Sequence, residues 1–136
     1  METILAIDYG LARIGLAISR VGLADPLKVI YNKVYKENQA SDLINDKTLL
    51  ELLSIIETEK VERLVVGVSE QKMATRILRF VDLLKEKISL PIETVDETLS
   101  SYEVKQRLND LPKKKSIGPI DHYAAALILE NYLELC

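Results

Sequence analysis

An almost unbroken apolar run near the amino terminus, residues 3–8 (TILAID), constrains the fold more than any other part of the chain. A strand with one face in water alternates apolar and polar side chains, whereas a strand covered on both faces is apolar throughout. The run therefore predicts a strand with a packed layer on each side. It ends in Asp8, which places a carboxylate at the carboxyl end of a buried strand.

A second strand is predicted over residues 13–19 (RIGLAIS), where large and small apolar residues alternate. Gly15 and Ala17 make one face of this strand small, so another element can approach that face closely. The intervening residues 9–12 fit a tight hairpin in which Gly10 takes a positive φ. The first two strands are therefore expected to pair antiparallel.

Hydrophobic spacing and turn signals mark the remaining elements. In chain order they are a turn at Asp25-Pro26, a strand near 27–34, a helix over 46–59 capped by Asn45 or Asp46, a strand over 63–68, a helix with Ala74, Ile77, Leu78, Val81 and Leu84 on its apolar face, a strand over 91–97, a short helix from Ser100 through Leu108, a polar loop over 109–118, and a last helix from Gly118-Pro119. Three strands followed by alternating helices and strands predict an α/β fold with a mixed five-stranded sheet and helices on both faces.

Length and composition favour one domain over residues 1–136, since 136 residues with 48% hydrophobic content are enough for one core. No apolar run approaches the roughly 20 residues of a membrane-spanning helix, and no basic leader precedes an apolar segment, so we expect a cytoplasmic protein without a membrane partner. The single cysteine, Cys136, excludes an internal disulfide and a cysteine-based zinc site.

Carboxylates stand at three strategic places: Asp8 ends the first strand, Asp96-Glu97 ends the last, and Asp121 lies in the first turn of the last helix. If the first and last strands are neighbours and the last helix packs over them, these acids converge at the sheet edge where α/β proteins bind ligands. Asp121 shares a helix face with Ala124, Ala125 and Ile128, which suits close packing on the sheet. Converging carboxylates repel one another unless a cation neutralises them, and hard oxygen ligands suit Mg²⁺ or Mn²⁺.

Each carboxylate also has a purely structural interpretation. Asp8 is a common type of turn residue, Asp121 complements the helix dipole, and the Asp96-Glu97 pair combines a strand end with a helix cap. Only the joint placement of the three groups favours a site. In a regular strand Asp96 and Glu97 point to opposite faces, so one of them is expected to bind metal, and the alternation alone leaves open which.

The formal net charge of −3 gives no global basic field, which is evidence against a nucleic-acid partner. This evidence is weak, because a nuclease that binds metal ions through carboxylates is itself locally acidic. Local phosphate contacts are expected from Arg13 and from Lys113, Lys114 and Lys115, although the lysine run is equally consistent with a solvated loop. His122 is a candidate for proton transfer or a surface residue without a role. Tyr9 either packs at the strand end or stacks on a base.

The chain resembles the YqgF/RuvX family of RNase H-like proteins, described as pre-16S rRNA nucleases and earlier as Holliday junction resolvases. The resemblance lies in AIDYGLARIGLAIS (6–19), DPLKVI (25–30), VVGV (65–68), PIETVDETLSS (91–101) and IDHYAAALILENYL (120–133). It implies an RNase H-like fold and a divalent metal site at Asp8, Asp96-Glu97 and Asp121. Two features depart from the family pattern: Thr98 stands where the family usually has Arg, and the loop within GVSEQKMATR (67–76) is shorter than usual.

The expected function is therefore metal-dependent hydrolysis of phosphodiester bonds, with Mg²⁺ or Mn²⁺ held by Asp8, Glu97 and Asp121 and with Asp96 as the further catalytic candidate. The expected substrate is structured RNA, in maturation of the 5′ end of pre-16S rRNA, or branched DNA. The protein is expected to be a monomer or a homodimer. Two other classes stay open: a nucleotide-binding protein of the actin and sugar-kinase type, which needs a second domain, and a non-catalytic RNase H-like module that binds RNA or protein.

Overall fold

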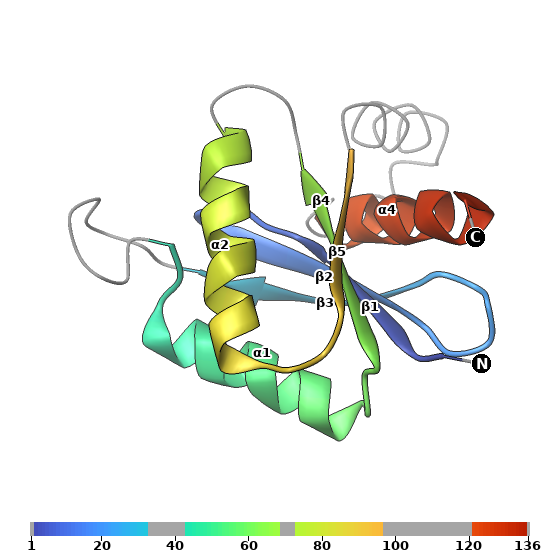
Figure 1. The fold of residues 1–136 in the computed structure, drawn as a ribbon, viewed down its shortest axis with the longest axis horizontal. Coiled ribbons are helices and arrows are strands. Elements are labelled where there is room, and N and C mark those ends of the chain that lie inside the picture. The colour runs from blue at the N-terminus through green and yellow to red at the C-terminus, as the bar shows by residue number, and fades with distance from the viewer. Residues whose placement is uncertain (1, 33–42, 69–72, 97–120, 136) are drawn as a thin grey trace, which may run out of the picture.

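The chain forms a five-stranded mixed sheet with helices on both faces (Figure 1). The computed structural model describes residues 2–32, 43–68, 73–96 and 121–135. The elements are β1 (Ile4–Asp8), β2 (Arg13–Ser19), β3 (Asp25–Tyr31), α1 (Asp46–Thr58), β4 (Arg63–Val68), α2 (Met73–Lys87), β5 (Ile92–Asp96) and α4 (Asp121–Leu135). The predicted element order is confirmed in these ranges. The short helix predicted from Ser100 through Leu108 and the loop over 109–118 lie outside them.

The strand order is β3-β2-β1-β4-β5, so the apolar run at β1 occupies the centre of the sheet. β1 pairs antiparallel with β2 and parallel with β4, and β5 pairs parallel with β4. The predicted meander of three strands followed by parallel strands is confirmed. The condition under which the acids were expected to converge, that the first and last strands are neighbours, is not met, because β4 lies between them. All three parallel strands nevertheless end at the same edge of the sheet.

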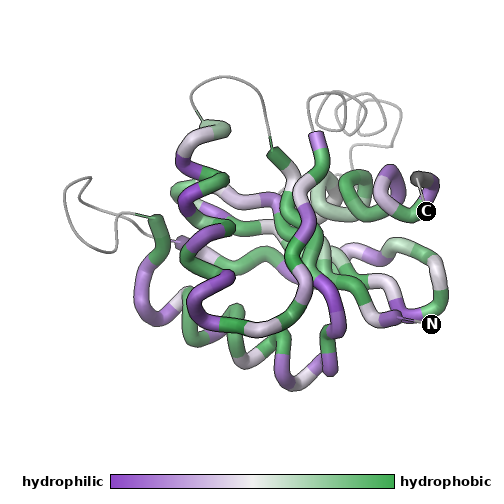
Figure 2. Tube along the Cα trace, viewed as in Figure 1, coloured by the Kyte–Doolittle hydropathy of each residue, from purple (hydrophilic) through white to green (hydrophobic). Residues whose placement is uncertain are grey.

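Two apolar layers cover the two faces of the sheet. On one face, α1 and α2 pack against the bulky residues of β1, β2 and β4, including Leu5, Ile14 and Leu64. On the other face, α4 packs on small residues: Ala6 and Ala17 share a core cluster with Ala125. The close approach predicted from the small face of β2 is thus confirmed. Figure 2 shows hydrophobic strands at the centre and helices with hydrophobic and hydrophilic residues intermixed along them.

The predicted turn at Asp25-Pro26 is wrong, because both residues belong to β3. Pro26 pairs with Ala17, next to a register shift between Leu16 and Ala17. Proline has no N–H to give to a ladder, and an edge strand tolerates this because only one of its sides is paired. Because β3 is an edge strand, it can contain Pro26, although the local sequence predicts a turn at this residue.

The prediction of a positive φ at Gly10 is also wrong; Gly22, in the β2–β3 connection, has the positive φ of 88°. Glycine is needed at position 10 for a different reason: a Cβ there would lie 2.6 Å from the backbone oxygen of Arg13.

The predicted apolar face of α2 differs from the observed one at one position. Leu78, predicted on that face, is 49% exposed, whereas Phe80 is buried. No helix in the described ranges is both long and apolar enough to cross a membrane.

The layer on the α1 face can be tested with two leucines of α1, Leu52, which is fully buried, and Leu50, which is 67% exposed. Leu52→Ala should lower the free energy of unfolding by about 2–5 kcal/mol, because it leaves a cavity in the core. Leu50→Ala should change it by less than about 0.5 kcal/mol. Urea unfolding followed by circular dichroism measures both. Equal losses in the two variants would contradict this packing.

Candidate metal centre

Asp8 is the last residue of the central strand and is half-buried. Ile4 and Ala6, four and two residues earlier, belong to the core cluster beneath α4. Because side chains alternate along a strand, Asp8 lies on this same face of the sheet. Its partner on β2 is Gly15, which contributes no side chain directly opposite Asp8.

The turn after Asp8 is anchored by Tyr9, whose ring is buried and stacks on Phe80 with centroids 4.5 Å apart. The Tyr9 hydroxyl donates a hydrogen bond to the backbone oxygen of Leu43. The interpretation of Tyr9 as a packing residue is confirmed. Stacking on a nucleic-acid base is excluded for this ring because protein covers it.

Asn32 forms a second, buried anchor that the sequence analysis missed. Its backbone N–H donates to the Ala12 oxygen at 2.8 Å, and its Nδ2 donates to the oxygens of Gly10 at 3.2 Å and Leu43 at 3.1 Å. Its Oδ1 accepts from the N–H of Asn45, the residue that caps α1, at 2.8 Å. One amide therefore joins the turn after Asp8 to the start of α1, and no sequence pattern marks it.

The helix α4 runs antiparallel to β1. Tyr132 and Leu133, near its carboxyl end, line a hollow together with Ile4 and Arg63 at the amino ends of β1 and β4. At about 1.5 Å per residue, the first turn of α4 lies roughly 16 Å from Tyr132 along the helix axis, toward the carboxyl ends of the strands. Asp121 begins this helix at the edge of the sheet where β1 ends. Its side chain lies outside the described part of the structure.

Asp96 ends β5 and pairs with Val68 of β4. Val68 and Ile92 pack in the core on the α1 and α2 face, whereas Val95 packs in the cluster beneath α4. The register of β5 is regular from Ile92 to Asp96, so Asp96 lies on the α1 and α2 face. Asp8 and Asp96 thus lie at the same edge but on opposite faces. Glu97 falls outside the described residues.

Arg13 begins β2 and is exposed, one turn after Asp8. Lys113, Lys114 and Lys115 and the side chain of His122 lie outside the described ranges. Within those ranges no three His, Cys, Asp or Glu side chains form a group able to hold a metal ion. Of the predicted metal centre, the described structure therefore contains Asp8 with its anchored turn and the helix α4, which begins with Asp121.

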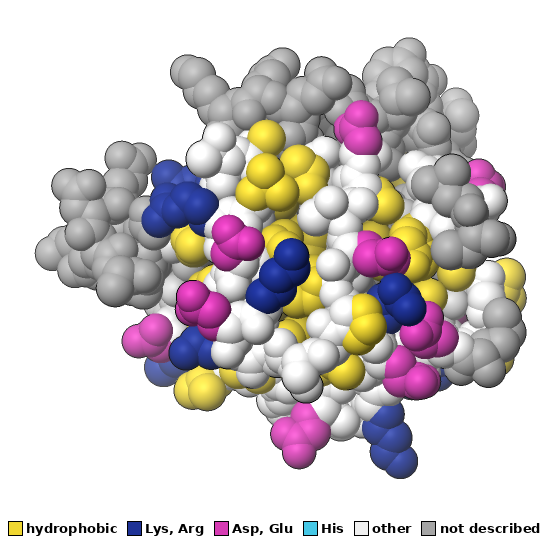
Figure 3. All heavy atoms as spheres, in the orientation of Figure 1, with side chains coloured by type: hydrophobic (Ala, Val, Ile, Leu, Met, Phe, Trp, Pro, Cys, Tyr) yellow, Lys and Arg dark blue, Asp and Glu magenta, His cyan; other side chains and the backbone are white. Residues whose placement is uncertain are grey.

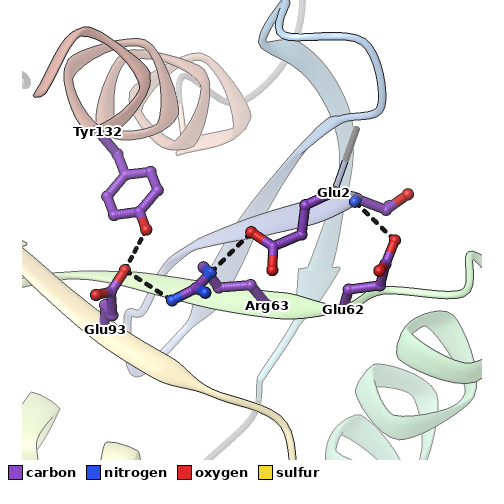
Figure 4. A network of polar contacts seen from close by, with 6 residues as sticks. Glu2, Glu62, Arg63, Glu93 and Tyr132 are labelled. Carbon is purple, nitrogen blue, oxygen red and sulfur yellow. Dashed lines mark hydrogen bonds and ion pairs between the residues drawn. The ribbon is translucent and has the colours of Figure 1, made fainter. Parts of the chain in front are cut away.

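A polar network ties the sheet to α4 at the opposite, amino edge (Figure 4). Arg63 Nε donates to Glu2 at 2.9 Å, and its Nη1 lies 3.3 Å from Glu93. The hydroxyl of Tyr132 donates to the same Glu93 carboxylate. The hydrogen bond to Glu2 raises the pKa of Arg63 above its usual value, so the guanidinium stays charged. The network joins β4 and β5 to the last turns of α4.

The family model "RuvX: Holliday junction resolvase" matches residues 2–135. The chain belongs to the RuvX family. A protein of Maridesulfovibrio salexigens named "Putative pre-16S rRNA nuclease" is 38% identical over 96% of both chains. A protein of the same name from Sulfurovum sp. is 37% identical over 96% of this chain and 97% of its own.

Solved structures show the same fold for this RuvX chain. T. thermophilus RuvC in complex with a Holliday junction substrate has a TM-score of 0.67, covers 99% of this chain and 95% of that one, and is 15% identical. The fowlpox virus Holliday junction resolvase has a TM-score of 0.54, covers 98% of both chains and is 11% identical. The RuvX chain therefore has the RNase H-like fold of RuvC-type resolvases, as the sequence resemblance implied.

The Asn32 anchor predicts a larger stability loss than an ordinary helix cap. Asn32→Ala leaves the part-buried Gly10 carbonyl and Asn45 N–H without this partner, while the Leu43 oxygen keeps the Tyr9 hydroxyl, and should lower the free energy of unfolding by about 2–3 kcal/mol. The matched control is Asn45→Ala, which removes the side chain that accepts from the N–H of Lys47 and should cost about 1 kcal/mol. Urea unfolding of both variants makes the comparison. A loss for Asn32→Ala no larger than that of the control would contradict the anchoring role.

Proposed function

We propose that this RuvX protein is a metal-dependent nuclease that hydrolyses phosphodiester bonds in the maturation of the 5′ end of pre-16S rRNA. The observation that carries the proposal is the position of Asp8: it ends the central strand, on the face that α4 covers, next to a turn held by two buried anchors. A carboxylate fixed in this way suits a ligand whose position must not drift during catalysis.

The residues at this edge fit a hard divalent cation. The family motif supplies carboxylate oxygens from Asp8, Glu97 and Asp121, which are the donors that Mg²⁺ and Mn²⁺ prefer. Asp8 pairs with Gly15, so the position directly opposite it on β2 carries no side chain. When bound, divalent ions supply a nucleophile at neutral pH and stabilise the leaving oxygen. We propose that Asp8, Glu97 and Asp121 hold them.

Between Asp96, which ends β5, and Glu97, the next residue in the sequence, we propose Glu97 as the ligand. The support is the register of β5, in which Asp96 shares a face with Ile92 and Val68, away from Asp8. If side chains continue to alternate for one more residue, Glu97 lies on the same face of the sheet as Asp8. Asp96 then contributes to the electrostatics of the edge from the other face.

The protein's own cations bind and orient the substrate in this proposal. Arg13 is exposed close to Asp8, and Lys113, Lys114 and Lys115 precede Asp121 in the sequence. Because Thr98 replaces the arginine usual in the family, phosphate binding depends more on these cations. Figure 3 shows Lys, Arg, Asp and Glu side chains interspersed over the face formed by α2 and β5, so no basic track crosses that face.

The identity to relatives named pre-16S rRNA nuclease favours the RNA substrate, because they are 38% and 37% identical over nearly the whole chain. A four-way DNA junction is the second candidate substrate, supported by the RuvX family description and by the fold shared with RuvC bound to a Holliday junction. Cleavage of a structured RNA carrying the 5′ precursor sequence of 16S rRNA, compared with a four-way DNA junction, distinguishes the two. Both assays need Mn²⁺ and a parallel sample with chelator.

Asp8→Asn should reduce metal-dependent cleavage by at least about a hundredfold while the protein stays folded, because the substitution removes one charge from a repulsive group of carboxylates. Glu97→Gln should reduce it to a similar extent, whereas Asp96→Asn should have a clearly smaller effect. Single-turnover cleavage rates at saturating Mn²⁺ provide the measurement. Full activity in Asp8→Asn would remove Asp8 from the mechanism, and the reverse order for Asp96 and Glu97 would exchange their roles.

Phosphate contacts by Arg13 and the three lysines predict a change in salt dependence. Arg13→Ala, and separately the triple replacement of Lys113, Lys114 and Lys115 by alanine, should weaken RNA binding and reduce the slope of log affinity against log salt by roughly one unit for each lost contact. Lys85→Ala, on the last turn of α2, is the control for Arg13→Ala, because both remove one positive charge. An unchanged slope would show that the replaced residues do not bind phosphate.

A further inference from the structure

The edge of the sheet opposite Asp8 carries a hollow that the proposed nuclease chemistry does not use. It consists of two adjoining parts, both lined by Gly22 and Leu133, between the β2–β3 connection and the last turns of α4. We call it the amino-edge hollow. In Figure 1 the β2–β3 connection, the end of α4 and the start of the chain lie together on the right. Ile4, Ala24 and Leu133 give the hollow apolar walls.

Large apolar side chains stand exposed at the rim of this hollow. Leu23, which lines the hollow, and Val21, next to the lining residue Gly22 in the chain, are each 69% exposed, the highest values among the exposed large hydrophobic residues of the described structure. Single exposed apolar residues are ordinary, but two in one short connection beside an apolar hollow form a patch of the kind that binds other molecules. The β2–β3 connection thus presents apolar contacts to a partner.

The charge of the hollow is strongly one-sided. Four carboxylates line it, Glu2, Asp25, Glu130 and Glu134, against a single cation, Arg63. Arg63 itself is already paired with Glu2 and Glu93. The rim therefore repels nucleic acid, anionic lipid and a second copy of this chain, whose net charge is −3. A cationic partner is attracted.

A buried polar group inside the hollow is left without a hydrogen bond. Ser19 is 1% exposed, lines the hollow, and its Oγ has no hydrogen-bond partner among the described residues. Buried hydroxyls are normally paired, so an orphaned one calls for a specific reason. A hydroxyl oxygen accepts an N–H, which a lysine, an arginine or a peptide backbone can donate.

We infer that the amino-edge hollow docks a protein segment that combines apolar side chains with lysine or arginine. Its apolar residues pack on Val21, Leu23 and Leu133, its cations face the acidic rim, and an N–H group satisfies Ser19. This surface lies at the far end of the sheet from Asp8, so a partner can be held there while the carboxyl edge stays open to substrate. The inference is independent of the proposed nuclease activity.

The test uses the purified full chain and three short labelled peptides of equal length, made of Leu and Lys, of Leu and Glu, or of Ser and Lys. Fluorescence anisotropy should show saturable binding of the Leu/Lys peptide, weakened by added salt, and at least about tenfold weaker binding of the other two. Equal affinity for all three peptides, or no saturable binding of the Leu/Lys peptide, would overturn the inference.

Variants locate the binding. Leu23→Ser and Glu134→Lys, both at exposed positions, should each weaken the Leu/Lys peptide by about tenfold. Leu50→Ser, at a similarly exposed leucine on α1, should leave its affinity unchanged. Ser19→Ala should weaken the peptide and raise the melting temperature, because it removes an unpaired buried hydroxyl. Unchanged affinity in Leu23→Ser and Glu134→Lys would place the binding elsewhere.

Two further measurements separate the other possible occupants. Sedimentation showing self-association that Leu23→Ser abolishes would assign the hollow to a second copy of the chain, and binding to vesicles of anionic phospholipid that Leu23→Ser abolishes would assign it to a membrane. Either result would overturn the inference. Cleavage by Leu23→Ser should equal that of the parent, so a failure of the docking inference and a failure of the proposed nuclease function give different results.

Discussion

The burial of β1 on both faces is the constraint on which the rest of this structure depends. A strand without a polar face requires a layer on each side, and α1 with α2 supplies one while α4 supplies the other. It also requires paired neighbours on both edges, which β2 and β4 provide. Asp8 is suited to hold a ligand because it ends β1, a strand that is packed on both faces and paired on both sides.

Local periodicity was sufficient to predict the strands over 13–19 and 63–68 with the bounds that the structure has, because alternation and apolar runs are properties of consecutive residues. It failed at Pro26, where the tolerance for proline depends on β3 being an edge strand. It also failed on the order of strands, because nothing in β1 and β5 indicates that β4 pairs with both. Pairing is a property of the whole chain.

The candidate site also contains residues that the local sequence predicts and residues that it does not. Asp8 was predictable because it directly follows an apolar run, whereas Asn32 was not, since its partners, Gly10, Leu43 and Asn45, come from different segments. The face of Asp96 needed the observed register, because alternation says that neighbours differ but not which of them faces α4. The two polar networks differ in exposure: the Asn32 side chain is fully buried, while the Arg63 ion pairs are partly exposed and screened by water.

Four alanines lie in the contact between α4 and the sheet, Ala6 and Ala17 on the strands and Ala125 and Ala126 on the helix, beside the larger Ile4, Val65, Ile128 and Leu129. At these four positions no side chain extends beyond Cβ, so the backbones of the helix and the strands can approach closely there. A larger side chain at Ala6, Ala17 or Ala125, all fully buried, overfills the layer and forces side chains or the helix backbone to shift. The placement of α4 above the end of β1 therefore depends on residues that carry no charge and lie in an apolar layer away from the carboxylates.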